Sequence, residues 1–154
     1  MPSTDTTAED DLPRLLGDHA SVHFTRMSLP AVTPAGLAHM EDSARAAIGM
    51  LADIRPDVVL FACTSGSFFQ GSEHERELTA DLESIAGAPV VTTARAMVEA
   101  LARRGQRVRL RTPYSDELTA LEVAYLEHAG LSQRRHRGHW RTLAIPPQYW
   151  IRAN

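Results

Sequence analysis

The stretch DVVLFAC, from Asp57 to Cys63, and the residues TSGS that follow at 64–67 decide how the rest of the chain is interpreted. The apolar run is continuous rather than alternating, which predicts a strand buried on both faces of a parallel sheet. The small polar residues then stand at the carboxyl end of that strand, where open α/β sheets bind their ligands. The stretch therefore predicts both a fold class and the place of a functional site.

On either side of this strand, short β-branched runs alternate with longer helical patterns. Capping residues are expected at Thr33, Thr93 and Ser115, with Pro34 at the first position of its helix. The order β-α-β-α-β-α-β-α predicts an α/β fold, a layered and doubly wound parallel sheet with right-handed crossovers. Strands are predicted at 21–27, 57–63, 89–92 and 108–112, and helices at 34–51, 73–86, 94–104 and 116–129.

The two ends of the chain depart from this pattern. Residues 1–130 are interpreted as one α/β domain that lacks its first strand, because residues 2–4 look like the turn after a strand. Residues 131–154 hold five arginines and both tryptophans, without a helical or a strand period. We interpret them as an atypical basic tail, disordered or encoded in a shifted reading frame; the alternative is an arm for nucleic acid or another partner.

Composition excludes several classes of protein. A formal charge of -3 over 154 residues argues against a nucleic-acid-binding protein. The acidic start does not resemble a signal peptide, and no apolar run approaches the ~20 residues that span a bilayer, so a cytoplasmic location is expected. One cysteine excludes an internal disulfide and a cysteine zinc cluster. A zinc site at His136 and His139 has little support, because neither has an acidic or cysteine neighbour.

Cys63 is the residue with the clearest chemical potential. Gly66 would allow a positive φ and a nest of backbone N–H groups, which would lower the pKa of the thiol or bind a carboxylate. The alternative is that a lone cysteine is a small buried hydrophobic residue. Thr92, Thr93 and Tyr114 end the neighbouring strands, and they would therefore share one sheet edge with Cys63.

Several ordered motifs resemble one family. The segments LFACTSGSF at 60–68, PVVTTA at 89–94, TPY at 112–114 with DEL at 116–118, and VHFTRM at 22–27 are similar to segments of maleate cis-trans isomerases and arylmalonate decarboxylases, in the aspartate/glutamate racemase superfamily. Residues 2–9 resemble the loop after the family's first strand. The resemblance covers residues 2–130. It implies an N-terminal half of an enzyme built from two similar α/β halves with the site between them, here truncated at both ends.

The resemblance also implies a mechanism without metal or organic cofactor. Cys63 would attack the double bond of a small dicarboxylate such as maleate, and rotation within a succinyl-like adduct followed by elimination would give fumarate. The substrate would contact the residues matching the family's motifs: Asp5, Thr64, Ser65, Gly66, Thr92, Thr93 and Tyr114. Cys63 favours an isomerase, because the decarboxylases commonly lack a cysteine there.

Two differences from the family limit how far its mechanism applies to this chain. Asp5 stands where isomerases commonly have asparagine, and an ionised Asp5 would repel a dicarboxylate. The second catalytic cysteine has no counterpart, so we expect weak or no turnover, and an exposed half-interface would favour homo-oligomers. A decarboxylase-like or racemase-like enzyme acting on a related carboxylate, and a non-catalytic binding module, remain the alternatives. No nucleic-acid or membrane partner is expected.

Overall fold

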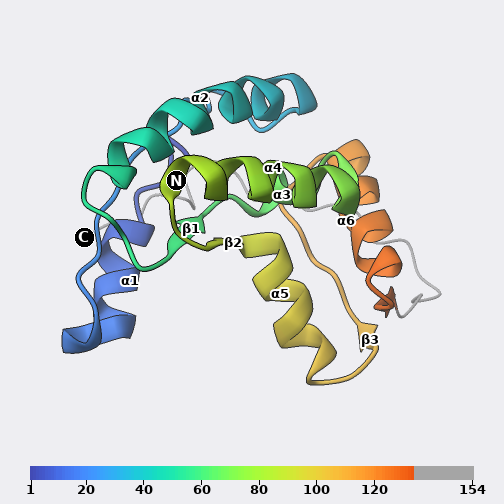
Figure 1. The fold of residues 1–154 in the computed structure, drawn as a ribbon. Coiled ribbons are helices and arrows are strands. Elements are labelled where there is room, and N and C mark those ends of the chain that lie inside the picture. The colour runs from blue at the N-terminus through green and yellow to red at the C-terminus, as the bar shows by residue number, and fades with distance from the viewer. Residues whose placement is uncertain (134–154) are drawn as a thin grey trace.

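The computed structural model describes residues 1–133, in which helices pack against short parallel strands (Figure 1). In chain order the elements are α1 (Ala8–Leu16), the 3-10 helix η1 (Gly17–His19), α2 (Pro34–Ala52), β1 (Val59–Phe61), α3 (Thr64–Phe68), α4 (Gly71–Ala86), β2 (Val90–Thr92), α5 (Thr93–Ala102), β3 (Arg107–Val108), α6 (Asp116–His128) and β4 (Ser132–Gln133).

Parallel pairing places the carboxyl ends of β1 and β2 together. In this pair Val59 lies opposite Val90 and Phe61 lies opposite Thr92. A second parallel pair joins β3 to β4. Figure 1 shows α2 and α4 together on one side of β1 and β2, with α5 on the other. The predicted α/β class with a parallel sheet is confirmed.

Two of the predicted helix starts are also confirmed. The Thr33 side chain accepts a hydrogen bond from Gly36 N at 3.1 Å, and Pro34 begins α2. The Ser115 side chain accepts one from Leu118 N at 3.3 Å and caps α6. Each cap satisfies one N–H group that the helix itself leaves without an acceptor. The start of α5 was predicted one residue too late, because the Thr92 hydroxyl, not that of Thr93, accepts from Arg95 N.

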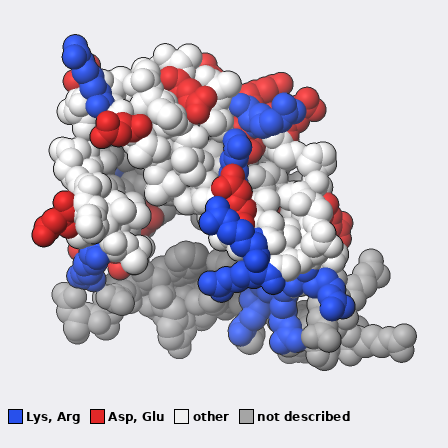
Figure 2. Space-filling view, turned by 60° about the horizontal axis from the view of Figure 1, so that its bottom comes forward, with Lys and Arg blue, Asp and Glu red and all other residues white. Residues whose placement is uncertain are grey.

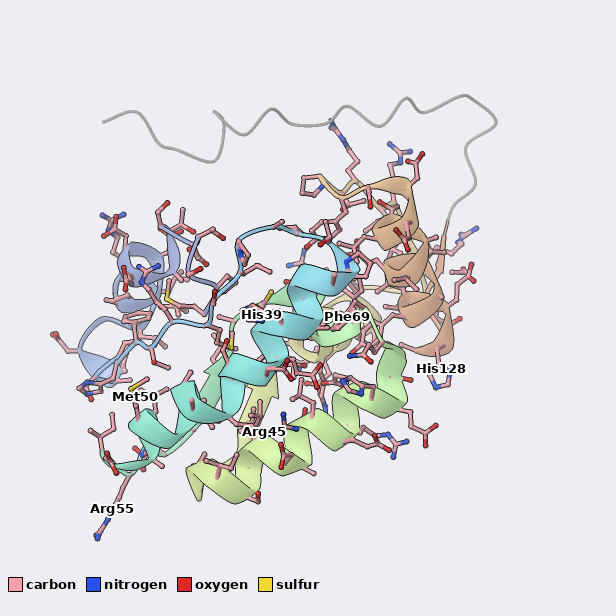
Figure 3. The ribbon with its side chains drawn as sticks, turned by 90° about the horizontal axis from the view of Figure 1, so that it is seen from above. His39, Arg45, Met50, Arg55, Phe69 and His128 are labelled. Atoms are coloured by element: carbon pink, nitrogen blue, oxygen red, sulfur yellow. The ribbon has the colours of Figure 1, made fainter. Side chains whose placement is uncertain are left out.

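The hydrophobic core lies between α2, α4, β1 and the α3–α6 region. Phe68, Leu37 and Met40 are fully buried, and the Phe68 ring packs against two tyrosines from the α6 region. Arg45 on α2 pairs with Asp81 on α4 at 2.6 Å, so an ion pair joins these two helices outside the core (Figure 3 labels Arg45). No helix among the described residues is long and apolar enough to cross a membrane.

The predicted strand at 21–27 is wrong as a regular strand. The segment pairs only at its end, where Met27 bridges Pro2 in parallel and exchanges hydrogen bonds with residues 1 and 3. The other residues of this segment have no ladder partner, so no strand extends along it. Helix α1 was not predicted, although its acidic first turn is typical of a helix start.

The strand at 57–63 was predicted to be buried on both faces, and this is also wrong. Only residues 59–61 form β1, and the face that carries Val58 and Leu60 stays 56% and 38% exposed. A cavity of about 480 Å³ explains this exposure. It lies between the unpaired segment 20–25, the adjoining edge of β1, and apolar side chains of α1 and α2.

The predicted strand at 108–112 shortens to β3, because only Arg107 and Val108 find a partner. That partner is β4, so the residues just after Gly130 include a strand that was not predicted. The rest of the predicted basic tail, residues 134–154, lies outside the described residues. The boundary at residue 130 therefore stays a prediction.

Candidate active site

Cys63 lies where β1 turns into α3. Its backbone is extended, with φ -147° and ψ 100°, and it caps the short helix that begins at Thr64. Its side chain is only 6% exposed. The Ser67 hydroxyl donates to the Cys63 carbonyl oxygen at 2.7 Å, which fixes the turn that follows the cysteine. The single thiol of the chain is thus held on a rigid junction between a strand and a helix.

Gly66 serves the site by its size and not by a positive φ. It lies within α3 and does not have a positive φ. The prediction that Gly66 forms a nest of backbone N–H groups is therefore wrong. A Cβ at this position would overlap Met40 Cε and come within 3.2 Å of Cys63 Sγ. Glycine therefore lets the backbone of α3 approach both the thiol and α2.

The environment of the thiol raises its pKa, contrary to the sequence-based expectation. Burial is the largest cause, because it disfavours the thiolate. A hydrogen bond from the Gly66 amide and one from the Ser65 hydroxyl oppose it, the latter with Sγ and Oγ 3.7 Å apart. Two donors are therefore in place to stabilise a thiolate once a base or a bound substrate helps it to form.

Tyr114 is brought to the same place from the loop before α6. Burial above all, together with the nearby charge of Glu122, raises the pKa of its hydroxyl to about 12, although a hydrogen bond with Ser65 acts in the opposite direction. The ring stands edge-on to Phe68, with centroids 5.8 Å apart. Tyr114 is therefore a neutral, well-anchored hydroxyl that shares Ser65 with the thiol.

Asp5 is already engaged by the chain. Its Oδ1 accepts from the amides of Thr7 at 2.8 Å and Ala8 at 3.1 Å. Burial raises the pKa of Asp5, but these hydrogen bonds lower it more, and the result is below its usual value. Arg26 holds this segment by donating to the carbonyl oxygens of Ser3 and Asp5. The carboxylate is therefore ionised and already makes hydrogen bonds at the start of α1.

Thr92, the last residue of β2, and Thr93, which follows it, make hydrogen bonds within the fold. Thr92 is fully buried; its hydroxyl donates to Glu75 Oε1 at 2.6 Å and accepts from Arg95 N at 3.2 Å. Thr93 is half-buried, and its hydroxyl reaches the Phe61 carbonyl oxygen at 3.4 Å. Thr64 is half-buried in the first turn of α3, where helix geometry leaves amides without an acceptor in the helix. The structure thus brings Cys63, Ser65, Gly66 and Tyr114 together. The Thr92 hydroxyl is instead engaged by Glu75 and the start of α5.

Sequence reasoning missed Glu122 on α6. Its side chain is 4% exposed, and Oε2 has no hydrogen-bond partner among the described residues. Burial raises the pKa of this carboxyl. The signal was available, because Glu122 stands four residues after Leu118 and three before Tyr125, on the buried face of the helix.

Comparison with known proteins gives consistent matches. The family model described as arylmalonate decarboxylase matches residues 2–138. The chain is 37% identical over 155 aligned positions to a maleate isomerase of Nocardia farcinica, covering 94% of the chain and 60% of the relative. It is 32% identical to a maleate isomerase of Pseudomonas putida, covering 95% and 62%. The chain therefore spans about 60% of the length of these curated relatives.

Solved structures agree with this comparison. The maleate isomerase Iso of Pseudomonas putida S16, in a cysteine-to-alanine variant with maleate, superposes with a TM-score of 0.80 at 29% identity, over 87% of this chain and 59% of that one. A cysteine-to-serine variant of the Nocardia farcinica maleate cis-trans isomerase, with a covalently bound succinylcysteine intermediate, gives a TM-score of 0.79 at 34% identity, over 86% of this chain and 60% of that one.

Proposed function

The chain belongs to the arylmalonate decarboxylase family, and from this membership we propose that it provides the Cys63 half-site of a maleate isomerase-type reaction on a small dicarboxylate. The observation that carries the proposal is the local arrangement of Cys63. Its sulfur accepts a hydrogen bond from the Gly66 amide and shares one with the Ser65 hydroxyl, and Tyr114 also hydrogen-bonds Ser65. One relative was solved with maleate and the other with a covalently bound succinylcysteine intermediate. We propose that Cys63 binds and reacts with its substrate in the same way.

The proposed reaction begins when the thiol loses its proton and Sγ forms a bond to one alkene carbon. The electron pair of the double bond moves to the neighbouring carbon, which takes up a proton and leaves a succinyl thioether. The former double bond is now single and rotates. Removal of a proton from the carbon next to the C–S bond then expels the thiolate and restores the double bond in the trans form. Cys63 therefore acts as both nucleophile and leaving group.

The remaining site residues would hold the carboxylates. The amides of Thr64 and Ser65 belong to the first turn of α3, where they have no acceptor within the helix. The neutral Tyr114 hydroxyl can donate a hydrogen bond to a carboxylate at any pH below its pKa of about 12. Ionised Asp5 works against a second negative charge, so we expect weaker binding than an asparagine would give. Thr92 and Thr93 would contribute through the backbone they hold rather than through free hydroxyls.

The missing second cysteine limits turnover. The proton at carbon has to come from a group other than a cysteine of this chain. We therefore propose adduct formation with weak or no net isomerisation by this chain alone. We further propose a cytoplasmic location, because a reactive free thiol persists in a reducing compartment, and a dicarboxylate rather than a nucleic acid as the ligand.

The test is the intact mass of the purified chain after incubation with maleate. A mass increase equal to one maleate, absent in Cys63→Ser, is expected. Succinate is the matched ligand control, because it has the same charges but no double bond to accept the thiol. An unchanged mass with maleate, under conditions in which iodoacetamide labels Cys63, would reject the proposal. An adduct that also forms on a denatured chain at the same rate would reject the role of the site.

A further inference from the structure

Arginines without partners gather in one segment of the chain. The sequence has 16 arginines and no lysine. Of the eleven that the structure describes, five make ion pairs with Asp or Glu. The side chains of the other six have no ion pair or hydrogen bond with another described residue, and five of those six arginines lie between residues 103 and 111. We call this run, Arg103, Arg104, Arg107, Arg109 and Arg111, the arginine segment.

The arginine segment is exposed and contains no acidic residue. All five arginines are classed as exposed, whereas Val108 and Leu110 between them are half-buried. Alternation along β3 and the residues after it therefore directs Arg107, Arg109 and Arg111 to the same side. Figure 2 shows basic side chains gathered on the lower part of the face it presents, whereas acidic ones are scattered over other parts of that face.

The arginine segment leads into the candidate active site. Arg111 is followed directly by Thr112, Pro113 and Tyr114. Three residues span at most about 11 Å, and the seven from Arg107 to Tyr114 at most about 25 Å. Because the Debye length is about 30 Å at 0.01 M salt and about 8 Å at 0.15 M, the charges of Arg107, Arg109 and Arg111 act on Tyr114 at low salt, and Arg111 acts on it most strongly at physiological salt.

We propose that the arginine segment concentrates anions at the Cys63 site, so that the chain selects negatively charged substrates before they meet the thiol. This rests on the proposed function only for the identity of the substrate. A cluster of like charges beside a pocket raises the local concentration of oppositely charged ligands. It also offsets the ionised Asp5, whose charge would otherwise repel a dicarboxylate from the same site.

The experiment uses the one cysteine of the full chain as a reporter. Rates of Cys63 alkylation by iodoacetate, an anion, and by iodoacetamide, its neutral analogue, are measured at low and at physiological salt. The ratio of the two rates cancels differences in thiol pKa and accessibility. We expect this ratio to be about three- to tenfold higher at low salt than at physiological salt. In Arg107→Gln/Arg109→Gln/Arg111→Gln the ratio should fall and lose most of its salt dependence.

The matched control removes the same three charges elsewhere. Arg14, Arg55 and Arg76 are exposed, and Figure 3 shows Arg55 pointing outward beyond the end of α2. Their triple change to glutamine should leave the ratio within about twofold of the wild type. Arginines between 134 and 154 remain unchanged in every variant. Circular dichroism confirms that both triple variants stay folded, as expected for exposed positions.

Three outcomes would overturn the proposal. The two triple variants could behave alike, which would make net charge the cause. Folded Cys63 could react with neither reagent, which would mean that anions gathered by the arginine segment cannot enter the site. A single-stranded oligonucleotide could bind tightly and lose binding only in the variant of the arginine segment, which would assign the segment to nucleic acid. The maleate adduct is scored separately, so steering without adduct rejects the proposed function and not this proposal.

Discussion

At the residue scale, the fit around Cys63 depends on one missing side chain. Gly66→Ala would place a Cβ against Met40 Cε and Cys63 Sγ. We expect a loss of about 1–3 kcal/mol in the free energy of unfolding, in spite of the better helix propensity of alanine. Urea denaturation measures it. Gly49→Ala in α2, where nothing lies within 4 Å of the new Cβ, should instead stabilise by up to ~1 kcal/mol. Equal effects at both glycines would contradict the close-approach role.

Asp5 has two separable properties: its hydrogen bonds from the Thr7 and Ala8 amides, which cap the start of α1, and its charge. Asp5→Asn keeps a side-chain oxygen for the Thr7 and Ala8 amides, so stability should change by less than about 0.5 kcal/mol. Removing the charge should lower the pKa of Cys63, because Asp5 is one of the groups that raise it. The pH dependence of iodoacetamide labelling should therefore shift to lower pH, and maleate labelling should become faster. Asp5→Ala would lose the cap as well, at about 1 kcal/mol. An unshifted profile in Asp5→Asn would separate Asp5 from the site.

At the element scale, Thr92 couples the start of α5 to a buried carboxylate on α4. Thr92→Val removes both the cap and the donor to Glu75, so we expect a loss of about 2–4 kcal/mol, combining the cap with an unsatisfied buried acceptor. Thr92→Ser keeps the hydroxyl and should lose about 1 kcal/mol or less. Thermal unfolding compares them. If Thr92 contacts substrate instead, Thr92→Ser would slow maleate labelling without a change in stability.

The buried face of α6 gives stability a dependence on pH. Burial raises the folded-state pKa of Glu122 above its unfolded value, so the folded chain binds this proton more tightly. Stability from Glu122 is therefore greatest below the unfolded pKa and falls as pH rises through the folded pKa. Glu122→Gln should unfold at a higher urea concentration than wild type at pH 8, and at a similar one at pH 4. A constant difference across this range would show that burial does not raise the pKa of Glu122 in the folded chain.

Helices were predictable from local signals, whereas strand edges were not. Thr33-Pro34 and Ser115 determine their helix starts through hydrogen bonds within four residues, which a sequence displays. The one-sided exposure of β1 depends on whether residues 20–25 pair with a strand. Such pairing joins residues far apart in the sequence, so no local pattern shows it. The sequence predicted that Cys63 and Tyr114 lie close together, but not how: the shared sheet edge is wrong, because β3 pairs with β4 and not with β1 or β2. The raised thiol pKa and the buried Glu122 depend on packing that no motif describes.

At the scale of the whole molecule, the exposed face of the β1–β2 pair, part of which borders the cavity beside β1, should make the chain self-associate. Val58, Leu60 and Val91 stay 56%, 38% and 38% exposed, and Leu60 lies directly opposite Val91 across the two strands. An apolar patch of this kind on a sheet is an association site, since burying it removes apolar surface from water. Sedimentation velocity at rising protein concentration should therefore show growth of dimers or larger species.

The matched variant is Val58→Thr/Val91→Thr, because threonine keeps the β-branched shape and the strand preference of valine while it adds a hydroxyl. It should shift the distribution towards monomer at each concentration, with far-UV circular dichroism unchanged. As a control, Val32→Thr alters an equally exposed valine outside the strands, at 47%, and should leave association as it is. A wild-type chain that stays monomeric throughout would mean that the exposed strand face is too small or too well screened by its neighbours to drive association. Association that Val32→Thr weakens as much as the double variant does would place the contact elsewhere on the molecule.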